Sequence, residues 1–103
     1  MKVFWTKFAL FSLSEIYKYY KENVSITIAS NIKKNILSGA QQLEPYSLSG
    51  KIEDLLKELN EEHRFLVRGN YKIIYKIEDK KVYITDIFDT RQNPDKIIKR
   101  EKK

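Results

Sequence analysis

The sequence predicts an α+β fold, in which a mainly antiparallel sheet of four strands carries two N-terminal helices on one face. Two observations support this prediction. Residues 64–94 contain three runs rich in Val, Ile, Tyr, Phe and Thr, joined by short turns. Residues 7–44 contain two stretches in which apolar residues recur at helical spacing. The predicted order is β-α-α-β-β-β, and a chain of 103 residues is expected to form one domain over residues 1–103.

The N-terminal half supplies one strand and two helices. Residues 2–6 form a short β-prone run, and Thr6 is suited to cap the helix that follows it. Apolar side chains then recur at helical spacing over residues 7–22. Ser25 can cap the second helix, which Pro45 ends because proline disfavours helical backbone in the residue before it. Two such helices are enough to cover one face of a four-stranded sheet.

The middle and the end of the chain are expected to be less regular. Residues 51–60 have apolar side chains at helical spacing and predict a short third helix. Residues 94–103 are expected to be a charged tail that frays. The simplest interpretation of the acidic residues in and after the third helix is a solvated surface; they are Glu53, Asp54, Glu58, Glu61 and Glu62.

Two tight turns set the register of the last three strands. Gly69-Asn70 has the order that a two-residue type II′ turn prefers, because glycine takes the first position at little cost. Residues 78–81 supply the second turn, of either two or four residues. The resulting register assigns one face to Leu66, Tyr71, Ile73, Tyr75, Ile77, Val82, Ile84 and Phe88. It assigns the other face to Phe65, Val67, Lys72, Ile74, Lys76, Tyr83, Thr85 and Ile87.

The two predicted faces differ in character. The first is apolar and is the face that the helices can cover. The second is basic yet partly apolar, and no predicted helix covers it, which is unusual for a surface that meets only water.

Composition restricts the classes of function. The chain has no Cys and one His, so a usual zinc site is excluded, and with only three Gly it has no glycine-rich phosphate loop. We therefore expect neither a metal nor a cofactor. Apolar runs are too short for a membrane span, and no signal-peptide pattern is present, so a cytoplasmic protein without membrane association is expected.

Charge is unevenly distributed along the chain. Residues 44–62 hold two Lys against six acidic residues, whereas residues 63–103 hold twelve Lys and Arg against six acidic residues. A basic C-terminal half indicates a polyanionic or acidic partner, although a lysine-rich surface can also have no specific role.

A basic cluster is the candidate functional site. The register places Lys72 and Lys76 on the uncovered face, and Arg91 follows the last strand on the same side or at its rim. Arg64 and Arg68 flank the first hairpin. Cations that converge in this way can bind phosphate and stabilise a phosphorane. Cleavage of RNA would also need a base and an acid, for which a packing role is the simpler interpretation of each nearby candidate: His63, Tyr83, Asp86 and Asp89.

Three segments together resemble the RelE/ParE superfamily of bacterial type II toxins. They are Trp5-Thr6 before a helix with Ile16-Tyr17-x-x-Tyr20, the segment Arg68-Gly-Asn-Tyr-Lys-Ile-Ile-Tyr75, and the segment Ile87-Phe-Asp-Thr-Arg-Gln-Asn-Pro94. The resemblance spans nearly the whole chain and implies the same small β-α-α-β-β-β domain.

The resemblance also implies partners and site residues. A cognate antitoxin would wrap the toxin, and the apolar residues of the uncovered face would bind it; these are Phe65, Val67, Ile74 and Ile87. RelE-like members cleave mRNA on the ribosome without a metal, whereas ParE-like members inhibit DNA gyrase by binding. Lys72 lies where RelE-type enzymes often carry a functional arginine, and Arg91 matches the basic residue after the last strand. Catalysis would use Lys72, Arg91 and Arg68, with Arg64 and Lys76 contacting nucleic acid.

The resemblance leaves the molecular target open. The C-terminal Tyr or His of RelE-like nucleases has no equivalent, since Ile98 falls near that position. The last segment is closer to ParE-like toxins, while the basic face favours RNA. A third possibility is a non-catalytic domain that binds RNA or protein on the same fold. The oligomeric state is not predicted.

Overall fold

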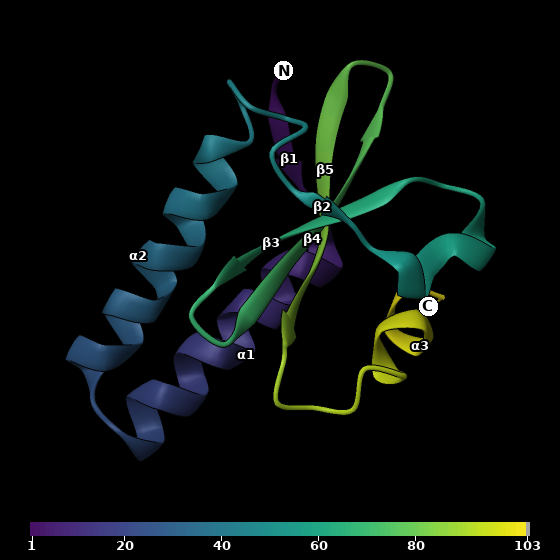
Figure 1. Cartoon of the computed structure of the whole chain (residues 1–103). Helices are drawn as coiled ribbons and strands as arrows, with labels where there is room; N and C mark the ends of the chain where they lie inside the picture. The colour runs from purple at the N-terminus through teal and green to yellow at the C-terminus, as the bar shows by residue number, and fades with distance from the viewer. Residues whose placement is uncertain (103) are drawn as a thin grey trace.

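The computed structural model describes residues 1–102 and contains one five-stranded sheet with the strand order β1-β5-β4-β3-β2 (Figure 1). The elements in chain order are β1 (Val3–Trp5), α1 (Lys7–Asn23), α2 (Ile26–Gln42), β2 (Lys51–Ile52), the 3-10 helix η1 (Asp54–Leu59), β3 (His63–Arg68), β4 (Tyr71–Glu78), β5 (Lys81–Asp89) and α3 (Lys96–Glu101). The predicted α+β class with two N-terminal helices is confirmed. The sheet has five strands, one more than predicted.

Both predicted helix caps form. The Thr6 hydroxyl accepts a hydrogen bond from the Ala9 amide at 3.1 Å, and the Ser25 hydroxyl accepts one from the Ile28 amide at 3.1 Å. These bonds satisfy amides that would otherwise have no partner in the first turn of each helix. The sequence therefore fixes where both long helices begin.

The predicted strand register is confirmed up to residue 84. Leu66 pairs with Ile73, and Ile77 pairs with Val82. The second turn has two residues, Asp79 and Lys80, with φ angles of 52° and 61°. Two consecutive positive φ angles are characteristic of a type I′ turn, whose twist matches that of the flanking strands.

A β-bulge in β5 overturns part of the predicted pattern. Ile74 pairs with Asp86 whereas Tyr75 pairs with Ile84, so Thr85 is an extra residue. One extra residue reverses the alternation of side chains beyond it. Ile87 consequently packs in the core beneath α1 and α2, and Phe88 packs on the other side of the sheet. The assignments of Ile87 and Phe88 to their faces were wrong.

The sheet separates two apolar cores, which define two faces. On the helix face, α1 and α2 cover a core that includes Leu13, Ile36, Ile73, Tyr75 and Ile84. On the opposite face, η1 and α3 cover a smaller core of Leu56, Ile74, Phe88 and Ile97. Figure 1 shows α2 and α3 on opposite sides of the sheet.

The prediction that the opposite face is uncovered was therefore wrong. Residues 51–60 do not form one helix, because Lys51–Ile52 pairs with β3 and only Asp54–Leu59 is helical. The charged tail contributes α3, in which Ile97 is 1% exposed. Short helices such as η1 and α3 leave no long periodic pattern of apolar residues in the sequence. Within residues 1–102 no helix is long and apolar enough to cross a membrane.

Candidate functional site

The two cations predicted to act together lie on opposite faces of the sheet. Tyr71 and Lys72 are neighbours on β4, so their side chains point to opposite faces. Arg91 donates to the Tyr20 hydroxyl on α1 at 3.0 Å and to the Tyr71 hydroxyl at 3.4 Å, which places it on the helix face. The expectation that Arg91 lies on the same side as Lys72 was wrong, because the two side chains are on opposite faces of the sheet.

Lys72 is neutralised by a buried carboxylate. Its Nζ lies 2.6 Å from Glu53 Oε2 and 4.1 Å from the centroid of the Phe65 ring. Glu53 is only 4% exposed, so the prediction of a solvated Glu53 was wrong. Glu53 also accepts a hydrogen bond from the Leu55 amide at the start of η1. The pair therefore ties η1 to β4, and the charge of the ammonium group is matched by the Glu53 carboxylate.

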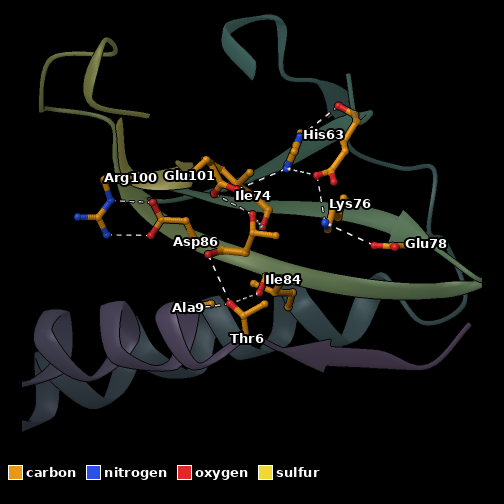
Figure 2. Close-up of polar contacts among 12 residues, drawn as sticks. Thr6, Ala9, His63, Ile74, Lys76, Glu78, Ile84, Asp86, Arg100 and Glu101 are labelled. Atoms are coloured by element: carbon orange, nitrogen blue, oxygen red, sulfur yellow. Dashed lines mark hydrogen bonds and ion pairs between the residues drawn. The ribbon is translucent and has the colours of Figure 1, made fainter. Parts of the chain in front are cut away.

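The two residues predicted to contact nucleic acid are also engaged. Lys76 Nζ lies 3.0 Å from Glu61 and 3.4 Å from Glu78 (Figure 2), and these carboxylates raise the pKa of Lys76 against the effect of burial. Arg64 donates to the Gly50 carbonyl at 2.9 Å and lies 3.1 Å from Glu62. Both cations are therefore paired with groups of their own chain.

Arg68 lies apart from the other predicted catalytic residues. Its Nη2 donates to Gln42 Oε1 at 2.6 Å, at the end of α2. The side-chain stem passes Gly39, where an added Cβ would lie 2.9 Å from Arg68 Cγ. Gly39 thus permits the close approach of α2 to β3, and Arg68 is part of that packing.

Arg91 belongs to a compact polar group at the end of β5. Its guanidinium contacts Asp89, with Nε–Oδ1 and Nη2–Oδ2 distances of 2.9 Å each, and its side chain is 54% exposed. The Tyr71 hydroxyl donates to the Tyr20 hydroxyl at 3.2 Å. Hydrogen bonds with Tyr71 and Arg91 lower the pKa of Tyr20, while burial raises the pKa of Tyr71. The hydrogen bond with Arg91 lowers the pKa of Asp89.

This polar group borders a cleft between α1 and the segment after β5. We call it the Arg91 cleft; its volume is about 420 Å³, and its lining includes Phe11, Glu15, Tyr19, Tyr20, Tyr71 and Arg91. Phe11 and Tyr19 are 59% and 58% exposed. Large exposed aromatic rings beside a half-exposed arginine are typical of the centre of a protein interface. The Arg91 cleft is therefore the candidate functional site.

A buried carboxylate links the cleft to α3. Asp86 is fully buried and accepts hydrogen bonds from Arg100 at 2.7 and 2.8 Å and from Ser12 at 2.9 Å. Figure 2 shows the paired Arg100 contacts. Asp86 is thus satisfied by α1 and α3 together, and Arg100 forms one wall of the cleft. No pattern in the sequence indicates this link, since Arg100 lies within a run of charged residues.

A second buried group lies beneath α3. The His63 side chain is 1% exposed, and its Nε2 lies 3.4 Å from Glu101 Oε1 (Figure 2). The Thr85 hydroxyl donates to the other Glu101 oxygen at 2.9 Å. These contacts hold α3 on the sheet, and they engage the almost completely buried His63 ring. Within residues 1–102, no group of three or more His, Cys, Asp or Glu is placed to hold a metal ion.

The four residues predicted to bind an antitoxin are not one exposed patch. Val67 is 50% exposed and Phe65 is partly exposed, whereas Ile74 and Ile87 are 0% and 2% exposed. The expected exposure of Ile74 was wrong because η1 and α3 cover it, and that of Ile87 was wrong because of the bulge.

The chain is similar to known proteins in both sequence and fold. The family described as "ParE toxin of type II toxin-antitoxin system, parDE" matches residues 3–94. Among solved structures, one described as the chromosomal ParDE TA system from P. aeruginosa has 20% sequence identity and a TM-score of 0.72. The similarity covers 86% of this chain and 95% of that chain. No curated protein matches the chain in sequence.

Proposed function

Because the chain belongs to the ParE toxin family of type II toxin–antitoxin systems, we propose that it arrests growth by binding DNA gyrase and does not cleave mRNA. The observation that carries this proposal is the 2.6 Å pair between Lys72 and the buried Glu53, on the face of the sheet opposite Arg91. Stabilising a phosphorane requires cations that are preorganised around one phosphate. Here one cation is neutralised and the other faces a different surface.

The Arg91 cleft is the proposed contact with gyrase. Binding energy at protein interfaces is concentrated in a few aromatic and arginine residues that are well supported by their neighbours. Arg91 is held by Asp89 and two tyrosine hydroxyls, so little conformational freedom is lost when it meets a partner. Phe11 supplies an exposed apolar surface beside it.

A cognate antitoxin is the second proposed partner. Phe65 and Val67 are the predicted antitoxin contacts that keep exposed surface on β3. We expect Val67→Glu to weaken antitoxin binding while the fold persists, because Val67 is half exposed. Val24→Glu is a matched control, since Val24 is 54% exposed at the end of α1. Equal binding by the two variants would place the antitoxin elsewhere.

Two assays on the purified protein test the proposed function. We expect inhibition of gyrase supercoiling and no cleavage of mRNA on programmed ribosomes. Phe11→Ala and Arg91→Ala should each raise the concentration needed for inhibition by about 30-fold, which corresponds to about 2 kcal/mol for an interface hot spot. Leu10→Ala is the control, because Leu10 is 51% exposed on α1 but does not line the cleft.

Each outcome of these assays bears on the proposal. Cleavage of mRNA without inhibition of gyrase would overturn it and would restore a catalytic role for the basic residues. Inhibition that all three variants retain would keep gyrase as the target and reject the Arg91 cleft as the contact. Activity in neither assay, from a folded protein, would favour a binding domain that has lost toxicity.

A further inference from the structure

The edge of the sheet formed by β1 and the start of β5 carries an exposed aromatic pair. Phe4 and Tyr83 are partners in the parallel ladder, and their rings stack with centroids 5.7 Å apart and planes inclined by 26°. Phe4 is 41% exposed. Lys81 Nζ lies 5.9 Å from the centroid of the Phe4 ring. A partly exposed aromatic ring, stacked on Tyr83 and with a cation over it, is thus displayed on the surface.

Three lysines gather around this pair. Val3 pairs with Val82, so the residues that precede them, Lys2 and Lys81, lie side by side, and Lys80 occupies the adjoining turn. Within residues 1–102, none of these lysines forms an ion pair with a carboxylate. Adjacent like charges on neighbouring strands destabilise a sheet. This concentration of positive charge therefore costs stability in the isolated chain.

The nearby carboxylates are fewer than the lysines. Glu78 is the cross-strand partner of Lys81, but its carboxylate lies 3.4 Å from the Lys76 ammonium, and Asp79 is the other carboxylate at the turn. The other cations of the sheet that were singled out from the sequence are engaged, as with Lys72 and Glu53. The lysines of the β1–β5 edge differ from these cations, because they are exposed beside an aromatic ring and form no ion pair with a carboxylate of residues 1–102.

We propose that the β1–β5 edge binds single-stranded nucleic acid, with a base stacked on Phe4 and the flanking phosphates on Lys2, Lys80 and Lys81. Aromatic rings and a track of positive charge are the two components of sequence-tolerant binding to single strands. A duplex fits less well, because its bases are paired and cannot stack on a protein ring. This surface lies at the opposite end of β5 from the Arg91 cleft and is independent of gyrase binding.

Fluorescence anisotropy with labelled oligo-dT and oligo-rU of about a dozen nucleotides tests the proposal. We expect both to bind at low salt, with the tighter of the two indicating whether DNA or RNA is the natural ligand. Three phosphate contacts predict a slope of about −2 for log affinity against log salt concentration, since each contact on a single strand contributes about −0.7. A DNA duplex of the same length should bind more weakly.

Matched variants separate stacking from charge. Phe4→Leu should weaken binding about 10-fold, within the range expected for the loss of one base–aromatic stack. Phe11→Leu removes a ring on α1 that is more exposed than Phe4, 59% against 41%, and should have no effect on binding of the oligonucleotides. Lys81→Gln should reduce the salt slope by about 0.7, whereas Lys34→Gln, on the exposed side of α2, should leave it unchanged. Circular dichroism and thermal melts of each variant establish that the fold is intact.

Three results would overturn the proposal. One is equal affinity of Phe4→Leu and wild type, since the base would then not stack on this ring. Another is duplex binding as tight as that of single strands. The third is competition by polyglutamate as effective as that by oligo-dT, which would assign the edge to an acidic protein. Because gyrase is absent from the assay, failure here leaves the proposed toxin function untouched.

Discussion

The two faces of the sheet are stabilised in different ways. On the helix face, α1 and α2, of 17 residues each, cover a broad apolar core. On the opposite face, η1 and α3, of six residues each, cover a small core and are held by charged pairs. Lys72–Glu53 ties down η1, and Arg100–Asp86 with Glu101–His63 tie down α3. Residues that suggest catalysis in the sequence therefore hold η1 and α3 in place on the opposite face.

Truncation of adjacent core residues tests whether both faces are closed. Ile73 packs on the helix face and Ile74 on the opposite face, and both are 0% exposed. We expect Ile73→Ala and Ile74→Ala each to lower the free energy of unfolding by about 4 kcal/mol, because each opens a cavity in a packed core. Urea denaturation measures both. A cost below about 1 kcal/mol for Ile74→Ala would mean that the opposite face is open to solvent.

Removal of Lys72 tests the buried pair. We expect Lys72→Ala to destabilise the fold by about 3 kcal/mol, because it leaves the Glu53 carboxylate buried without a partner. Lys76→Ala is the control and should cost less than about 1 kcal/mol, since Glu61 and Glu78 are more than half exposed. A double-mutant cycle with Glu53→Ala isolates the coupling. Costs of equal size for the two lysines would show that Glu53 does not depend on Lys72.

The helix caps should also differ between the faces. Ser25→Ala removes the hydroxyl that accepts from the Ile28 amide and should cost about 1 kcal/mol of stability in thermal or urea unfolding. At α3, Asp95 makes no side-chain cap hydrogen bond, so Asp95→Ala should cost at most a few tenths of a kcal/mol. A larger loss for Asp95→Ala would indicate that α3 depends on its own N-terminus more than on its contacts with the sheet.

Lowering the pH should slightly reduce the free energy of unfolding through Asp89, which lies on the helix face. The hydrogen bond with Arg91 lowers the pKa of Asp89 in the folded state below its unfolded value near 4. The group therefore contributes stability above pH 4, and this contribution is lost as the pH falls through the folded pKa. Unfolding free energies from pH 7 to pH 3 should decline less steeply for Asp89→Asn than for wild type. If the unfolding free energies of wild type and Asp89→Asn decline equally with pH, the Asp89 carboxylate does not contribute to the loss of stability in acid.

Much of the helix face could be predicted from the sequence. The periodic stripes of α1 and α2, the capping residues Thr6 and Ser25, and the register from Leu66 to Ile84 all follow from local rules. Each depends on residues close in sequence or on one turn. The family resemblance implies the same order of elements that these local patterns predict.

The opposite face could not be predicted because its features are not periodic. A single bulge at Thr85 exchanged the positions of Ile87 and Phe88, and strict alternation cannot anticipate an extra residue. Glu53 and Arg100 lie in charged segments, which are typical of a solvated surface. Only the fold shows that Glu53 pairs with the partly buried Lys72 and that Arg100 pairs with the buried Asp86. The Arg91 cleft was missed because Tyr20 and Tyr71 fit the apolar stripes of their own elements.

The central claim, that Lys72 is structural and the protein acts by binding, is tested most directly by the double variant Lys72→Met with Glu53→Met. Replacing a buried ion pair by apolar residues of similar volume is often neutral for stability. The measurement is inhibition of gyrase supercoiling by the folded double variant beside wild type. We expect equal inhibition. Loss of inhibition from a double variant that still folds and still binds the antitoxin would contradict the account and return Lys72 to the functional site.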